Sequence, residues 1–147
     1  MLIFRAILRE ENIVILAEKM KCMNLITFCC ACQNLVRPIN IINKIYPFEH
    51  IQSLGLFNNI KGYVIGITNP IVNNEKVVPW DLLINLNKGT VMGKGGLEKT
   101  KEDVLSQDLT FINEILSSIK NNKINEAQLR KYFYQYTKNN LGTNFCV

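Results

Sequence analysis

Long apolar runs are absent from this 147-residue sequence. The longest candidate, residues 25–36, is interrupted by three polar residues, whereas a helix that spans a bilayer needs about 20 consecutive, mostly apolar residues. The N-terminal segment also makes a poor signal peptide, because Arg5 and Arg9 cut its apolar run and no small-residue cleavage site follows. We therefore expect a soluble, cytoplasmic protein.

Histidine is scarce, and the cysteines lack further metal ligands. His50 is the only histidine, and four of the five cysteines fall within residues 22–32. A zinc site would need additional Cys or His ligands, and an odd number of cysteines does not make a complete disulfide framework. We interpret His50 and the cysteines as structural residues, and we expect no bound metal or cofactor.

Phosphate-binding loops and paired catalytic carboxylates are missing as well. The segment GTVMGKGG, residues 89–96, has three residues between its first glycine and the Gly-Lys pair, and Gly95 stands where a phosphate loop carries Ser or Thr. Asp81 has no second carboxylate placed beside it, so a cap or turn role is favoured over acid–base catalysis. We expect no side-chain catalysis; a nucleotide-binding enzyme that uses residues 89–96 is the weakest alternative.

Acidic residues are few near the C-terminus, although the whole chain carries a net charge of only +5. Beyond residue 119, Glu126 is the only acidic residue, and the basic residues there are Lys120, Lys123, Arg130, Lys131 and Lys138. A basic helix can meet an acidic protein or an anionic membrane surface, or it can simply be solvated. No nucleic-acid-binding signature accompanies the charge, so we expect no nucleic-acid partner.

Apolar patterning predicts an α/β fold. Residues 2–9 have helical periodicity, residues 13–16 form a continuous apolar run typical of a buried strand, and residues 20–35 contain no glycine or proline. Two further strands are predicted in residues 61–68 and 80–87. Because strands alternate with helices, we expect a central mixed or parallel sheet flanked by helices, followed by C-terminal helices.

The C-terminal part is predicted to be helical. An amphipathic helix is expected in residues 108–119, with an apolar face made by Leu109, Ile112, Ile115, Leu116 and Ile119. Asn125 is expected to cap a last helix with one apolar stripe, Leu129, Tyr132, Phe133 and Tyr136. We divide the chain into a central α/β portion (1–91), an exposed loop rich in Gly and Lys (92–107) and a C-terminal helical portion of the same domain (108–140).

Three segments, LIFRAILREENIVILAE, YPFEHIQSLGLFNNIKGYVIGITNP and FINEILSSIKNNKINEAQLRKYFYQYT, occur in this order. Together with WDLL they resemble the central and C-terminal part of the DENN domain family, in its polarity and late-secretory Avl- and Afi-like branch. The resemblance implies a guanine nucleotide exchange factor, or part of one, that binds a Rab- or Arf-family small GTPase in vesicle traffic or cell polarity. It also implies peripheral association with intracellular membranes. Since the N-terminal lobe of that family is missing, a passive GTPase-binding adaptor or scaffold, or an incomplete fragment without exchange activity, is the alternative.

Two segments have more surface chemistry than packing requires, and we expect a partner to dock there. The resemblance places the turn after the strand at 61–68 near the GTPase surface, whereas the closing helix is chosen for its charge. A turn that only terminates a strand, and a basic helix face that is only solvated, are the structural alternatives. The candidate partner-binding residues are Thr68, Asn69, Pro70, Asn73, Asn74, Arg130 and Lys131.

Overall fold

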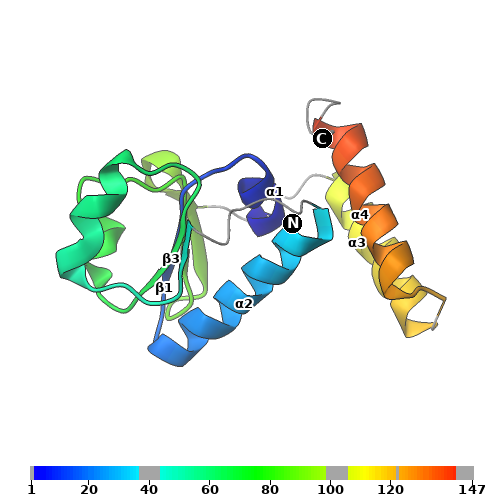
Figure 1. Cartoon of the computed structure of the whole chain (residues 1–147), viewed down its shortest axis with the longest axis horizontal. Helices are drawn as coiled ribbons and strands as arrows, with labels where there is room; N and C mark the ends of the chain where they lie inside the picture. The colour runs from blue at the N-terminus through cyan, green and yellow to red at the C-terminus, as the bar shows by residue number, and fades with distance from the viewer. Residues whose placement is uncertain (1, 37–43, 99–105, 122, 142–147) are drawn as a thin grey trace.

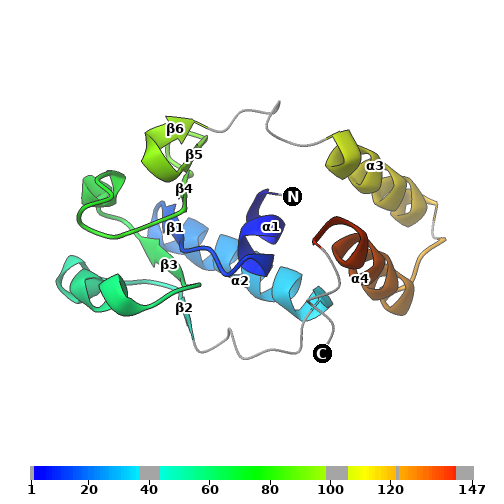
Figure 2. The ribbon, with the colours of Figure 1, turned by 90° about the horizontal axis from the view of Figure 1, so that it is seen from above.

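The computed structural model describes residues 2–36, 44–98, 106–121 and 123–141. A twisted sheet lies at one end of the molecule, and a hairpin of two helices, α3 and α4, lies at the other end (Figure 1). Helix α1 and the C-terminal half of α2 stand between them, as Figure 2 shows from above. The described chain therefore has a sheet layer, a middle helical layer and an outer helical hairpin.

The sheet has six strands in the order β2-β3-β1-β4-β5-β6. Their bounds are Ile13–Leu16 (β1), Ile45–Tyr46 (β2), Val64–Ile67 (β3), Leu82–Asn85 (β4), Thr90–Gly93 (β5) and Leu97–Glu98 (β6). Strands β1 to β4 are parallel, and β5 and β6 continue the sheet antiparallel. The expected mixed sheet with flanking helices is confirmed.

The three central strands, β1, β3 and β4, are apolar except for Asn85 at the end of β4, because both of their faces are covered. Every residue of β1, β3 and β4 is buried, as is typical of parallel sheets. Alternate residues enter two separate cores: Ile13 and Ile15 point to the core on the helical side, and Val14 and Leu16 to the other.

Helices and 3-10 segments cover opposite faces of the sheet. The α-helices are Leu2–Leu8 (α1), Lys19–Val36 (α2), Ser106–Lys120 (α3) and Glu126–Leu141 (α4), and the 3-10 segments are Ile51–Asn59 (η2), Pro70–Asn73 (η3) and Lys94–Gly96 (η4). The chain moves one way across the sheet from β1 to β2 and the other way from β2 through β3 to β4. Because crossovers between parallel strands are right-handed, the α2 connection lies on one face of the sheet, and the η2 and η3 connections lie on the other face.

Helix α4 begins at the residue expected from the sequence. Asn125 Oδ1 accepts a hydrogen bond from the Gln128 backbone N–H at 2.9 Å, and Gln128 Oε1 accepts one from the Asn125 N–H at 2.9 Å. This reciprocal pair satisfies two backbone donors that a helix start leaves without intrahelical partners.

The prediction of an exposed loop at residues 92–107 is partly wrong. Residues 92–98 complete β5 and form η4 and β6, with Gly93 paired to both Leu82 and Leu97. Gly95 has a φ of 81°, which glycine adopts without steric cost and which allows the sharp reversal between the two short strands. Residues 99–105 of the expected loop lie outside the described residues.

The buried face of α3 also differs from the prediction. The residues that enter the core from α3 are Asp108, Phe111 and Ile115, whereas three of the five expected core residues are about half exposed: Leu109 (50%), Leu116 (48%) and Ile119 (47%). Phe111 stacks on Tyr136 of α4 with ring centroids 4.2 Å apart and meets Phe133 edge-on at 5.2 Å. An aromatic ring removes more apolar area from water than one aliphatic side chain does, so Phe111 sets the orientation of the helix.

Three of the four residues in the apolar stripe expected on α4 face the core. Leu129, Phe133 and Tyr136 pack on the helical-side core, while Tyr132 is 46% exposed. The basic residues of the helix, which include Arg130, are exposed as expected.

The cysteines of α2 are buried or partly buried where the structure describes them. Cys22 and Cys29 are fully buried and Cys30 is partly buried, while the side chains of Cys32 and Cys146 lie outside the described ones. Cys22 Sγ donates toward the carbonyl oxygens of Ile15 and Ala17, at 3.5 and 3.4 Å. Burial raises the pKa of the Cys22 thiol, so it remains protonated at neutral pH.

Candidate functional site

The carboxyl ends of β1, β2 and β3 lie at one edge of the sheet because these strands are parallel. Each of them is followed within a few residues by a helix or 3-10 segment: α2 begins at Lys19, η2 at Ile51 and η3 at Pro70. In open α/β sheets this edge is where ligands and partners bind, since the loops after the strands converge there.

Exposed apolar side chains gather after these strand ends. Met20 is 68% exposed, Ile51 43% and Ile71 42%, and each lies in the first turn of the segment that follows its strand. Thr68 and Asn69, which directly follow β3, are exposed polar residues that line a pocket together with Ile51. We call these five residues, Met20, Ile51, Thr68, Asn69 and Ile71, the carboxyl-edge surface.

Backbone contacts hold the segments of this surface together. The Ala17 N–H donates to the Ile67 carbonyl oxygen at 3.1 Å, and the Glu49 N–H donates to the Gly66 carbonyl oxygen at 2.8 Å. The ammonium group of Lys19 lies 5.2 Å from the centroid of the Phe48 ring, a cation–π contact between the start of α2 and the segment after β2. The surface therefore rests on the rigid end of the sheet.

The turn residues expected to bind a partner have structural roles as well. Asn69 Oδ1 accepts from the Ile71 N–H at 3.0 Å and caps η3, Pro70 occupies the first turn, and Asn74 Oδ1 accepts from the Lys76 N–H at 3.0 Å. Thr68 and Asn73 are exposed alongside them. The turn thus has a fixed shape that presents its outer atoms to solvent.

A shallow pocket of about 240 Å³ opens at the same edge. Its lining comes from the start of η2 and the end of β3: Glu49, His50, Ile51, Gln52, Ile67, Thr68 and Asn69. The His50 ring packs edge-on against Phe48, with centroids 5.2 Å apart, so the only histidine has a packing role here.

Arg130 and Lys131 do not belong to this surface. Arg130 Nη2 lies 2.6 Å from Glu126 Oε1 one turn earlier in α4, and Lys131 is exposed. Helix α4 packs on the helical side of the molecule, whereas η3 covers the opposite face of the sheet (Figure 1). The structure therefore separates the two sets of candidate residues.

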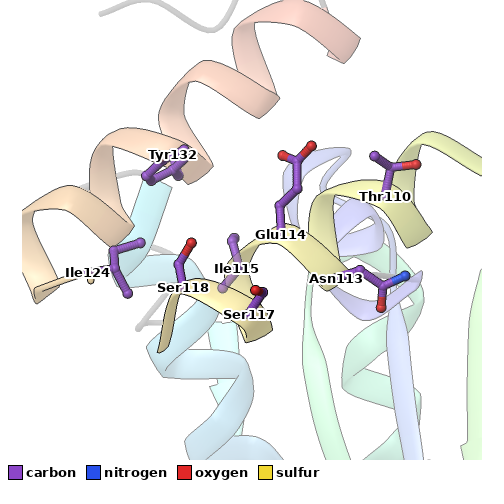
Figure 3. A pocket seen from close by; sticks show the side chains of 8 residues that line it. All are labelled: Thr110, Asn113, Glu114, Ile115, Ser117, Ser118, Ile124 and Tyr132. Atoms are coloured by element: carbon purple, nitrogen blue, oxygen red, sulfur yellow. The ribbon is translucent and has the colours of Figure 1, made fainter. Parts of the chain in front are cut away.

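A groove of about 600 Å³ runs between α3 and α4 (Figure 3). Its lining is mostly polar and contains one charged residue, Glu114: Thr110, Asn113, Glu114, Ile115, Ser117, Ser118, Ile124 and Tyr132. Sequence reasoning missed this groove, because it exists only through the angle at which the two helices meet.

A buried polar network joins α1, α3 and α4. Arg5 Nη2 donates to Asp108 Oδ1 at 2.7 Å and to the Tyr136 hydroxyl at 2.9 Å, and the Tyr136 hydroxyl donates to the same Asp108 oxygen. Asp108 is only 1% exposed, so its charge is compensated by Arg5 rather than by water. The network fixes the hairpin to the N-terminal helix.

Asp81 has the structural role expected of it, at the amino ends of the parallel strands. Its Oδ2 accepts a hydrogen bond from the Asn12 N–H at 2.9 Å and so joins the starts of β1 and β4. The nearby Tyr63 hydroxyl donates to the Pro79 carbonyl oxygen. Burial raises the pKa of Tyr63, and the charge of Asp81 raises it further, so this hydroxyl stays a donor at neutral pH.

Within the described part of the chain, no group of three or more His, Cys, Asp or Glu residues is placed to hold a metal ion. In the same residues, no helix is both long enough and apolar enough to cross a membrane.

A family model described as "SPA: Stabilization of polarity axis" matches residues 1–94. Comparisons with curated proteins and with solved structures found no match. The family match shows that the identification with the DENN domain family was wrong. The pattern behind that resemblance, a helix, a buried strand, a long helix and further buried strands, follows from packing any parallel sheet under helices and is not specific to one family.

Proposed function

The chain belongs to the SPA family and has a role in stabilization of the polarity axis, and we propose that it acts there by docking a small GTPase on its carboxyl-edge surface. The matched residues 1–94 include all of that surface. The observation that carries the proposal is that Met20, Ile51 and Ile71 are exposed apolar residues in the first turns of three segments that all follow parallel strands at one end of the sheet.

The composition of the carboxyl-edge surface suits a protein partner. Exposed apolar side chains that share one region and carry polar neighbours mark protein-binding sites more often than isolated ones do. Methionine is enriched at protein interfaces and adapts its shape to a partner. Thr68 and Asn69 offer hydroxyl and amide groups for hydrogen bonds at the rim.

A small GTPase suits this surface as a partner, because preferring one nucleotide state of a GTPase requires binding contacts but no catalytic side chains. Such a protein orders or releases its switch segments according to the bound nucleotide. A rigid apolar surface that contacts these segments binds one nucleotide state more tightly than the other and so couples polarity to that state.

The docking surface can be tested by charge insertion. We expect Ile71→Glu and Met20→Glu each to weaken binding to a Rab- or Arf-family GTPase by about tenfold or more, because a carboxylate would be desolvated at the interface. Binding is measured by calorimetry with the GTPase loaded with GDP, loaded with a GTP analogue, or free of nucleotide.

Leu56→Glu is the matched control for charge insertion. Leu56 is 72% exposed and lies in η2, which returns from the carboxyl end of β2 toward the amino end of β3. This variant should bind like the wild type. If no GTPase of a broad panel binds, or if the two edge variants bind as tightly as the control, the proposal is wrong.

Release of a fluorescent nucleotide from the GTPase distinguishes exchange from passive docking. A chain that binds the nucleotide-free state more tightly lowers nucleotide affinity by the same factor, and release accelerates if the transition state for release shares that preference. Binding without accelerated release identifies an adaptor.

The basic face of α4 gives a separate prediction. We expect Arg130→Glu with Lys131→Glu to lower the free energy of unfolding by less than about 1 kcal/mol, through loss of the exposed pair with Glu126 and one like-charge contact. Urea unfolding measures this. Unchanged GTPase binding would confine the site to the carboxyl edge, whereas a loss that shrinks at high salt would extend it to α4.

A further inference from the structure

Helix α3 carries a second apolar face that points away from the core. Leu109, Leu116 and Ile119 are about half exposed, and Ile112 is partly buried between them. We call these four residues the α3 stripe. Phe111 and Ile115, on the neighbouring face of the helix, pack on the core. The internal packing of α3 therefore does not need the exposed residues of the stripe.

The α3 stripe is also distinct from the groove between α3 and α4. Thr110, Glu114 and Ser117 line that groove from α3, as Figure 3 shows. At about 100° per residue, these positions centre roughly 120° around the helix from Leu109 and Leu116, and Asn113, which also lines the groove, lies between the two faces. Helix α4 therefore approaches one flank of α3 and leaves the stripe on the other.

The spacing within the stripe is symmetric about its midpoint. Its members follow one another at intervals of three, four and three residues, centred on position 114. A second helix of the same sequence, laid antiparallel, would bring Leu109 against Ile119 of the second copy and Ile112 against its Leu116. A two-fold interface requires such self-complementarity, because the same patch serves both copies.

We propose that the α3 stripe is an interface at which two copies of this chain pair antiparallel. The exposed part of the stripe offers roughly 300 Å² of apolar surface per copy, and with its polar flanks the pair would bury about 1,000 Å², at the low end of specific interfaces. The expected product is a weak, reversible dimer with a dissociation constant on the order of 10 µM.

The electrostatics of α3 permit this pairing. Antiparallel helices place the positive end of each macrodipole beside the negative end of the other. Glu114, at the centre of the helix, lies on the far side from the stripe and so does not meet its own copy across the two-fold axis. The dimer is independent of the carboxyl-edge surface and would present two such surfaces to GTPases on one assembly.

Complementary charges test both the interface and its direction. Sedimentation equilibrium of the wild type should give a dimer at concentrations near 100 µM. Leu109→Lys and Ile119→Glu should each weaken self-association by about tenfold or more, because both ends of each homodimer then desolvate a charge. In a mixture of the two variants, one end pairs Lys with Glu and the other keeps the original Leu–Ile contact, so association should recover toward the wild-type value.

Ser117→Glu, on the groove flank, is the matched control and should dimerise like the wild type. Thermal melts verify that each variant is folded, which half-exposed positions allow. A wild type that remains monomeric at about 200 µM would overturn the proposal, since the stripe would then serve another protein. Single variants that still dimerise would move the interface elsewhere, and a mixture without recovery would rule out antiparallel pairing.

Discussion

Gly66→Ala is expected to lower the free energy of unfolding by about 1–3 kcal/mol, and Gly66→Val by more, because the site is overfilled by a single carbon atom. A Cβ at position 66 would collide with the Pro47 carbonyl oxygen and lie 3.0 Å from Cys22 Cβ. The first contact is to backbone, which the neighbouring strand β2 holds in place. For a chain of this length, each 1 kcal/mol lowers the melting temperature by about 2–4 °C.

The matched control for this prediction is Gly55→Ala. Nothing lies within 4 Å of a Cβ built at Gly55, and its φ is not in the left-handed region. That variant should be neutral or more stable by up to about 1 kcal/mol, because alanine restricts the unfolded chain. Urea unfolding of both variants measures the contrast, and equal midpoints would show that β3 is not packed as tightly as described.

The central sheet was predictable because burial on both faces leaves a strong signal in the sequence. A strand such as Ile13–Leu16 has to be apolar throughout, since neither of its faces meets water. A glycine such as Gly66 inside another buried run marks a close approach, here that of Pro47. A strand that is only partly buried leaves a weaker signal in the sequence: most of β5 is partly exposed, and its second half was expected to belong to a loop rich in glycine and lysine.

The orientation of α3 was not predictable from periodicity. Its aliphatic residues, among them Leu109 and Leu116, make the clearer stripe in the sequence, yet of the five only Ile115 is buried, together with Asp108 and Phe111. The choice depends on tertiary partners that are distant in sequence: Tyr136, on which Phe111 stacks, and Arg5, which with Tyr136 meets Asp108 only after folding. Periodicity can locate an apolar face, but it does not tell a face that meets the core from one that meets solvent.

The candidate site was predictable only in part. The Asn-Pro pair after β3 marks a turn, and Thr68 and Asn69 of that turn do form part of the carboxyl-edge surface. Met20 and Ile51 gave no sequence signal, because an exposed apolar residue looks like a core residue until its neighbours are placed. Both follow strands of one parallel sheet, and this strand order brings segments that are distant in sequence to the same end of the sheet.

The two proposed surfaces lie on different parts of the molecule, and the buried network attaches one part to the other. The carboxyl-edge surface belongs to the part of the chain that the family model matches, residues 1–94, whereas the α3 stripe lies beyond it. Arg5 of α1 holds the hairpin through Asp108 and Tyr136. Loss of this network should release the α3–α4 hairpin while the sheet persists.

Asp108→Ala is therefore expected to destabilise the hairpin by about 3–5 kcal/mol, because it leaves the Arg5 charge buried without its carboxylate. Arg5 Nε has no acceptor among the described residues, so the guanidinium depends on the contacts made by its other nitrogens. Hydrogen exchange measures the effect by region. Backbone amides of α3 and α4 should lose protection strongly, while those of β1 and β3 should change much less.

The control for the Asp108 prediction replaces both ions. In Arg5→Met with Asp108→Leu no charge is buried, and apolar side chains of similar volume often substitute for a buried pair at little cost. The double variant should thus be more stable than Asp108→Ala, although the Tyr136 hydroxyl loses its acceptor. If Asp108→Ala leaves exchange in α3 and α4 unchanged, the ion pair does not hold the hairpin. If the double variant is the less stable of the two, the pair contributes net stability beyond charge compensation.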